Sequence, residues 1–162
     1  MSGSSQYKDR LIILELLRDA RQSNVALAKK VGLSEGAVRR RIEKLVESGR
    51  LIFTVVPDAA YMGRNVHAMI RIQSAPGATE RLVDELVSMH ELSYVYHCTG
   101  QFDITVVGFF KSNDELREFT TGKLGKTDGI VEIRTVITLR VAKRFHEWSL
   151  DNIMDDLDSD DE

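Results

Sequence analysis

The 162-residue chain has a single cysteine, Cys98, and no run of 18 apolar residues. One cysteine excludes an intramolecular disulfide framework and a zinc site built from several cysteines. The missing apolar run excludes a membrane-spanning helix of ordinary length. The opening residues, MSGSSQYKDR, also lack the apolar core of an export signal, so we expect a soluble, cytoplasmic protein.

Catalytic and cofactor motifs are also missing from the sequence. The four histidines, at positions 67, 90, 97 and 146, show no spacing typical of a metal site. The string Gly125-Lys126-Thr127 has neither the upstream glycines nor the strand-to-helix setting of a phosphate-binding loop. We therefore expect no enzyme activity, no metal ion and no cofactor.

The strongest positive signal is a pair of short helices within residues 23–48. Ser23 and Ser34 can each cap a helix, because a serine hydroxyl accepts from an otherwise unpaired backbone N–H. Ala28 and Gly32 are the small residues that allow two helices to approach closely and the chain to turn between them. This arrangement predicts a helix-turn-helix.

The second helix of the pair has an apolar face and a basic face. The apolar residues that lie within about a third of its circumference, with most of the cations opposite, are Val38, Ile42, Leu45 and Val46. A basic face is often only solvated, but the capped helix and glycine turn before it favour insertion into a DNA major groove. The residues expected to contact DNA are Ser23, Asn24, Ser34, Glu35, Gly36, Ala37, Arg39, Arg40, Arg41 and Lys44.

Charge is distributed unevenly along the chain, whose net charge is −3. Residues 1–50 carry 11 basic and 6 acidic side chains, whereas 7 acidic residues fall within the last dozen positions. Positive charge is thus concentrated near the predicted DNA-reading helix, as phosphate binding requires. We expect residues 146–162 to form a disordered, solubilising acidic tail; competition with DNA for the basic face is the alternative.

The pattern of apolar residues divides the chain into two domains. Residues 1–50 contain a helix at Tyr7–Arg18 and the helix pair, and residues 51–64 combine a strand at Leu51–Val56 with a linker. Residues 65–145 follow the order β-α-β-β-α-β, which is ferredoxin-like. The expected strands are 66–73, 94–98, 103–110 and 131–141, and the expected helices are 78–89 and 112–124. The fold class is α+β, a winged-type helix-turn-helix domain followed by a ferredoxin-like domain.

One face of the predicted sheet has no covering helices. Its outward candidates, Met69, Val107, Phe109 and Val136, are too apolar for a face left in water. Either the strand phase is wrong or a second copy of the chain covers the face. We expect the second copy, in a homodimer with sheets packed face to face that presents two DNA-reading helices at a fixed spacing.

The chain resembles the leucine-responsive regulator (Lrp/AsnC) family of transcription factors. The resemblance is carried by Leu16–Arg21, by Ser23–Ser34 with its Val-Gly-Leu-Ser turn, and by Thr99–Asp103, and it extends to about residue 145. It implies homodimers that assemble further, often into octamers, and an amino acid or related metabolite bound in the C-terminal domain. The DNA target is not implied, because the segment from Ser34 departs from the commoner forms of the family.

The resemblance also implies an effector site at the hairpin with the Gly-x-x-Asp motif. The alternative is that Gly100 only makes the turn and that Asp103 bonds to its own backbone. The expected effector site also includes two threonines near the end of the second helix of the domain, because that end of the helix could face the bound effector. The expected effector residues are Thr99, Gly100, Gln101, Phe102, Asp103, Thr120 and Thr121.

Two other functions compete with a ligand-responsive transcription regulator. Siroheme decarboxylases resemble this family, but the four histidines form no cluster suited to a porphyrin. The other possibility is a DNA-organising protein that binds no effector. A ligand that raises the melting temperature would distinguish the regulator from the DNA-organising protein.

Overall fold

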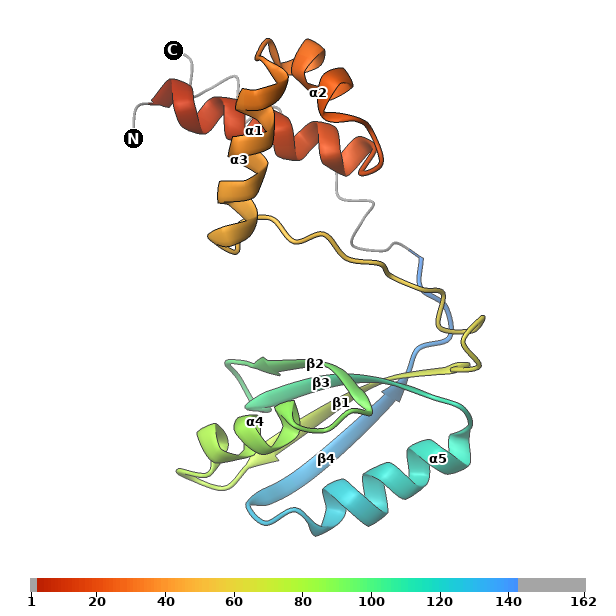
Figure 1. Ribbon diagram of the computed structural model, residues 1–162. Helices are drawn as coiled ribbons and strands as arrows, with labels where there is room; N and C mark the ends of the chain where they lie inside the picture. The colour runs from red at the N-terminus through yellow and green to blue at the C-terminus, as the bar shows by residue number, and fades with distance from the viewer. Residues whose placement is uncertain (1–2, 143–162) are drawn as a thin grey trace. The chain divides into compact units, whose positions relative to one another are not determined.

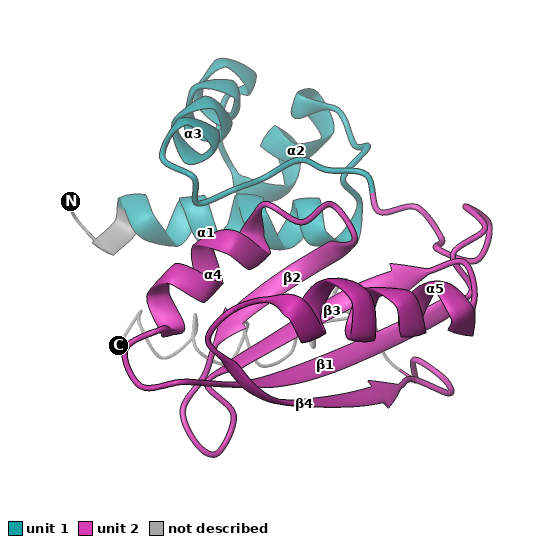
Figure 2. Ribbon diagram, turned by 90° about the horizontal axis from the view of Figure 1, so that it is seen from below, with its two compact units in different colours: residues 1–55, 143–162 teal, residues 56–142 magenta. Residues whose placement is uncertain are grey.

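The computed structural model describes residues 3–142, which divide into two compact units between Val55 and Val56 (Figure 2). This division lies inside the segment 51–64 that was expected to join two domains. The expected acidic tail, 146–162, lies outside the described residues. Within residues 3–142, no helix has the length and apolar character needed to cross a membrane.

The first unit contains the three helices α1 (Gly3–Arg18), α2 (Asn24–Val31) and α3 (Glu35–Glu47) (Figure 1). α1 begins four residues before the predicted start. Its core-facing positions are Ile12 and Leu16, one turn apart, whereas Leu17 is exposed. A single apolar core joins all three helices, and its buried residues are Ile12, Leu16, Leu27, Ala28, Val31 and Val38.

The strand expected at Leu51–Val56 is not formed. The segment has no regular structure. Leu51 packs half-buried on the core of the three helices, whereas the side chains after it are exposed, with Val55 87% accessible. A strand requires a neighbour that pairs with its N–H and C=O groups, and the elements described within residues 3–55 are all helices. The run of β-branched residues was therefore a poor guide at the boundary between the two units.

The second unit has the predicted β-α-β-β-α-β order. Its elements are β1 (Val66–Ser74), α4 (Thr79–Val87), β2 (Leu92–His97), β3 (Ile104–Phe110), α5 (Asn113–Arg117) and β4 (Ile130–Ile137). The strands lie in the order β2-β3-β1-β4, with every neighbouring pair antiparallel. α4 and α5 cover the same face of the sheet (Figure 2). The core beneath them includes Ile70, Ile72, Leu82, Leu86, Ile104, Val106, Phe110 and Phe119.

The α5 region departs from the regular helix expected over residues 112–124. Ser112 caps it as predicted, with its hydroxyl accepting from the Glu115 N–H at 3.2 Å. After Arg117 the chain widens into a π-helical turn, Glu118–Lys123, and closes with a 3₁₀ turn, Leu124–Lys126. A π turn shifts backbone hydrogen bonds by one residue, and periodicity alone does not reveal such a shift.

The strand register confirms that the four outward candidates share one face of the sheet. Met69 lies opposite Val107 on β3 and Val136 on β4, and His67 lies opposite Phe109. The His67 and Phe109 rings stack with their centroids 4.6 Å apart, and burial lowers the pKa of His67. This apolar outer face of the sheet is the surface that we expect a second copy to cover.

We predict that Met69→Glu prevents self-association, because a carboxylate on this face would lose its water on pairing without gaining a partner. Native mass spectrometry should show a dimer or larger assembly for the wild-type chain and a monomer for the variant. The matched control is Val87→Glu on α4, which is 66% exposed on the helical side of the unit. Equal masses for Met69→Glu and wild type would contradict the prediction.

Candidate functional site

The helix pair in the first unit has the predicted caps and turn. The Ser23 hydroxyl accepts from the Ala26 N–H at 3.2 Å, and the Ser34 hydroxyl accepts from the Ala37 N–H at 3.3 Å. Between the two helices, Gly32 adopts a left-handed conformation with φ +65°, and its N–H donates to the Ala28 carbonyl. The two caps and the glycine turn therefore fix where α2 ends and where α3 begins.

α3 presents its polar side to solvent because most of its apolar side packs against the other helices, although Val46, expected on that side, is 43% exposed. Val38 is 0% exposed and Leu45 is 5% exposed, and both are held against the rest of the three-helix unit. The opposite side carries exposed Arg40 and Lys44. The helix therefore has the arrangement needed to enter a duplex groove, with a buried apolar back and exposed cations.

Most of the residues expected to contact DNA are accessible. Ser23, Ser34, Glu35, Arg39, Arg40 and Lys44 are exposed, and Asn24, Gly36, Ala37 and Arg41 are half-buried. Gly36 and Ala37, in the first turn of α3, leave little side-chain bulk between the helix backbone and an approaching duplex. The assignment of this set to DNA stays a prediction.

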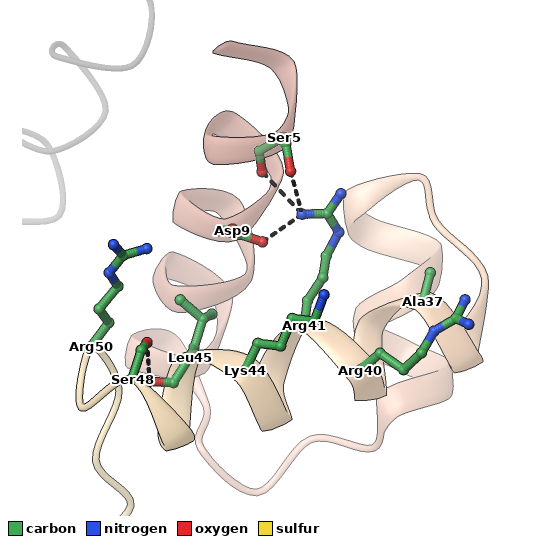
Figure 3. Close-up of a pocket in the computed structure, with 9 residues that line it drawn as sticks. All are labelled: Ser5, Asp9, Ala37, Arg40, Arg41, Lys44, Leu45, Ser48 and Arg50. Carbon is green, nitrogen blue, oxygen red and sulfur yellow. Dashed lines mark hydrogen bonds and ion pairs between the residues drawn. The ribbon is translucent and has the colours of Figure 1, made fainter. Parts of the chain in front are cut away.

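Arg41 differs from the other arginines of α3. One of its terminal nitrogens, Nη1, contacts Asp9 Oδ1 at 2.6 Å, the Ser5 carbonyl at 3.0 Å and the Ser5 hydroxyl at 3.2 Å (Figure 3). All three acceptors belong to α1. The guanidinium therefore joins α3 to α1, so part of its donor capacity and its nearest counter-charge lie within the protein.

Arg50 is a cation that the sequence pattern did not single out. It follows the end of α3, where Gly49 adopts φ +69° and the Arg50 N–H donates to the Leu45 carbonyl at 2.9 Å. Arg50 and Lys44 line the same hollow (Figure 3). A glycine just past the last helical residue is the signal that could have placed Arg50 next to the helix.

In the second unit, Asp103 joins the hairpin to the end of β1. Its Oδ2 accepts from the Ser74 N–H at 2.8 Å and from the Ser74 hydroxyl at 2.9 Å. These two hydrogen bonds lower the pKa of Asp103, the backbone bond contributing most. Both bonds go to one oxygen, Oδ2, and the backbone N–H of Asp103 itself makes a smaller contribution in the same direction.

The rest of the hairpin is open on one side. Gly100 has φ +112°, and a Cβ atom built there would meet nothing within 4 Å. Thr99 and Gln101 are exposed, whereas Phe102 is buried, with the Arg134 guanidinium 5.3 Å from its ring centre. The hairpin thus combines a left-handed glycine, an exposed backbone and an ionised carboxylate, which suits a small ligand carrying an ammonium group.

Thr120 and Thr121 have a structural role in the π-helical turn. The Thr120 hydroxyl donates to the Leu116 carbonyl at 2.9 Å, and the Thr121 hydroxyl donates to the Arg117 carbonyl at 2.7 Å. Both hydroxyls therefore bond back to carbonyls one turn earlier in the same chain segment. Their place in an effector site stays a prediction, and their hydrogen bonds explain the paired hydroxyls without a ligand.

Known proteins resemble this chain over both units. A family model described as winged helix-turn-helix DNA-binding matches residues 6–52, and a model described as Lrp/AsnC ligand binding domain matches residues 67–148. The HTH-type transcriptional regulator FL11 of Pyrococcus furiosus is 32% identical over 148 residues, covering 91% of this chain and 97% of that protein.

Solved structures share the fold. AsnC of E. coli superposes with a TM-score of 0.77 at 25% identity, covering 85% of this chain and 93% of that one. A transcriptional regulator of Neisseria meningitidis in complex with L-Met superposes with a TM-score of 0.80 at 21% identity, covering 90% of this chain and 97% of that one. The fold of each unit is therefore shared with these proteins.

We predict opposite effects on stability at two glycines of the helix pair. Gly32→Ala should lower the free energy of unfolding by about 1–2 kcal/mol, because its left-handed φ disfavours any side chain. Gly36→Ala should raise it by about 0.5 kcal/mol, because Gly36 lies inside α3 with open space around a Cβ atom. Urea denaturation of both variants measures the two free energies of unfolding. A similar decrease in both would contradict a left-handed conformation at Gly32.

Proposed function

Since the chain belongs to the Lrp/AsnC family of DNA-binding, ligand-responsive transcriptional regulators, we propose that it reads duplex DNA with α3 and binds its effector at the hairpin 99–103. The DNA-binding set is the one predicted from the sequence, except that Arg41 is assigned to holding α3 against α1, and Arg40 is the base-reading candidate. The effector is an amino acid or a related small metabolite.

A single observation carries the DNA assignment: α3 is buried on its apolar side and exposed on its basic side. Arg40 and Lys44 are four residues apart, so they project from one face of the helix on consecutive turns. Arginine donates two parallel hydrogen bonds to guanine in the major groove, which is the commonest base-specific contact. An arginine on this face is therefore well suited to read a base.

The effector assignment is supported by the chemistry of the hairpin. Asp103 is ionised at neutral pH, because the Ser74 hydrogen bonds favour its charged form, and its second oxygen can accept from an ammonium group. The L-Met bound to the Neisseria meningitidis protein, which shares the fold, makes amino acids the first compounds to test.

We further propose that the chain works without enzyme activity or cofactor, in the cytoplasm, as a homodimer that assembles into larger oligomers. The apolar outer face of the sheet supports the dimer, and two α3 helices per dimer suit an operator with two half-sites. Regulators related over most of their length support a role in transcription rather than in catalysis.

We predict that Arg40→Ala lowers affinity for a selected operator by about 1–3 kcal/mol and relaxes specificity at one base position. The operator would be obtained by selection from random duplexes with the wild-type protein, and affinities measured by fluorescence anisotropy at fixed salt. Arg117→Ala in the second unit removes the same charge and serves as the control. An unchanged affinity and an unchanged base preference for Arg40→Ala would remove Arg40 from the interface.

A pair of substitutions tests the role of Asp103 in effector binding. Asp103→Asn keeps an oxygen for the Ser74 bonds but loses the charge. Ser74→Ala loses the hydroxyl bonds to Asp103 and Thr79 but keeps the carboxylate and its bond from the backbone N–H of residue 74. The twenty standard L-amino acids are screened for an increase in the melting temperature of the wild-type protein. We predict that Asp103→Asn abolishes the increase and that Ser74→Ala reduces it less.

If Ser74→Ala reduced the ligand-induced rise in melting temperature more than Asp103→Asn, Asp103 would influence ligand binding only by holding the hairpin in place. No increase with any amino acid would favour the DNA-organising protein that binds no effector.

A further inference from the structure

A hollow of about 380 Å³ lies in the first unit between α1 and α3 (Figure 3). Ser5 and Asp9 line it from α1, and a stripe along α3 lines it from the other side. Arg50 borders it beyond the end of α3 (Figure 3). Ala37, Arg40, Arg41 and Lys44 in this lining belong to the predicted DNA-contacting set, whereas Ser5, Asp9 and Arg50 are not part of it.

The hollow is strongly basic. Its lining contains four cations, Arg40, Arg41, Lys44 and Arg50, and one carboxylate, Asp9. A concave surface of one charge concentrates the field and raises the local concentration of counter-ions. The sign of the excess charge favours an anion.

The single carboxylate is already used within the protein. Asp9 Oδ1 contacts Arg41 Nη1 at 2.6 Å, and the same nitrogen contacts two oxygens of Ser5. The Arg41 side chain is 27% exposed and that of Asp9 16%, so the pair is better shielded from water than an ordinary surface ion pair. Arg41 is therefore a positioning residue that holds α1 against α3.

The remaining cations lack such compensation. In residues 3–142, no carboxylate pairs with Arg40, Lys44 or Arg50, and all three are exposed. Figure 3 shows Lys44 between the other two along α3, with Arg50 beyond the helix end. The hydrogen bond from the Arg50 N–H to the Leu45 carbonyl fixes the Arg50 backbone relative to α3. Three cations without a carboxylate partner among the described residues therefore lie along α3 and just beyond its end.

We propose that this hollow is a binding site for the phosphodiester backbone of DNA, in which Lys44 and Arg50 each contact a backbone phosphate while Arg41 stays bound to α1. The site rests on the proposed DNA binding and divides α3 into two parts. The first half, with Arg40, faces base edges, and the end of the helix with Arg50 contacts the backbone. Phosphate contacts set the register and orientation of a protein on a duplex but carry no sequence information.

The division gives Lys44 and Arg50 a signature that differs from that of a base-reading residue. Each phosphate contact releases counterions, so the loss of one contact makes the negative slope of log K against log salt less steep by about 0.9. It weakens binding to every duplex by a similar factor. A base-reading contact instead changes the ratio of affinities for the selected and the unrelated duplex.

The experiment measures affinity over a series of salt concentrations for the full chain, on the selected operator and on an unrelated duplex of equal length. Lys44→Gln and Arg50→Gln are compared with Arg117→Gln, which removes one charge from the second unit. We expect each hollow variant to lower the salt slope by about 1 on both duplexes and to leave their affinity ratio at the wild-type value. Arg117→Gln should keep the wild-type slope.

Arg41→Gln separates positioning from DNA contact. We expect it to lower the melting temperature and keep the wild-type salt slope, because the lost contacts are with Ser5 and Asp9. A slope lowered by about 1 would place Arg41 on the DNA and overturn its assignment. Asp9→Asn, which leaves Arg41 without its carboxylate, is the second variant if Arg41→Gln does not fold.

Two further results would overturn the site itself. One is an unchanged salt slope for both Lys44→Gln and Arg50→Gln while the wild-type protein binds the operator. The other is a small-anion site. In that case inorganic phosphate, at matched ionic strength, would raise the melting temperature of the wild-type protein but not that of Lys44→Gln, and Lys44→Gln would bind DNA with the wild-type affinity. Failure of the wild-type protein to bind any duplex would instead refute the proposed function.

Discussion

The burial of one side of α3 is the constraint on which the DNA-binding face depends. Val38 and Leu45 are withdrawn from water almost completely, so the rotation of the helix about its axis is fixed by packing. Once that rotation is fixed, Arg40 and Lys44 have to face outward. The hydrogen bonds and ion pair of Arg41 then hold α3 against α1 at its basic flank. The exposed cations therefore belong to a rigid surface, and rigidity is what a contact with base edges requires.

In the second unit, too, the burial of one face determines which residues lie on the opposite face, here in a sheet. Two helices cover one face, and the apolar residues of the other face lie together because strand register places them there. The hairpin between β2 and β3 is held by the contact of Asp103 with Ser74 on β1. A ligand bound at this hairpin would therefore act on the sheet whose outer face is the expected dimer surface. We therefore expect effector binding and assembly to be linked through the contact of Asp103 with Ser74.

The sequence was most informative where the deciding interaction is local. Serine caps, the glycine turn and the alternation along β1 depend on residues within a few positions of one another, and all three were predicted. It was least informative where the partner is distant. Arg41 meets Asp9 across 32 positions, and no pattern within α3 reveals that contact. The strand expected at Leu51–Val56 failed for a related reason, since β propensity does not show whether a neighbouring strand exists.

The most direct test of the account is whether the full chain binds duplex DNA through charged contacts. Fluorescence anisotropy with a labelled random-sequence duplex, measured over a series of salt concentrations, gives the answer. We expect clear binding at low ionic strength that weakens linearly in log K against log salt, with tighter binding to a selected operator. A protein that ignores double-stranded DNA at low ionic strength, although folded and assembled, would contradict the role assigned to α3.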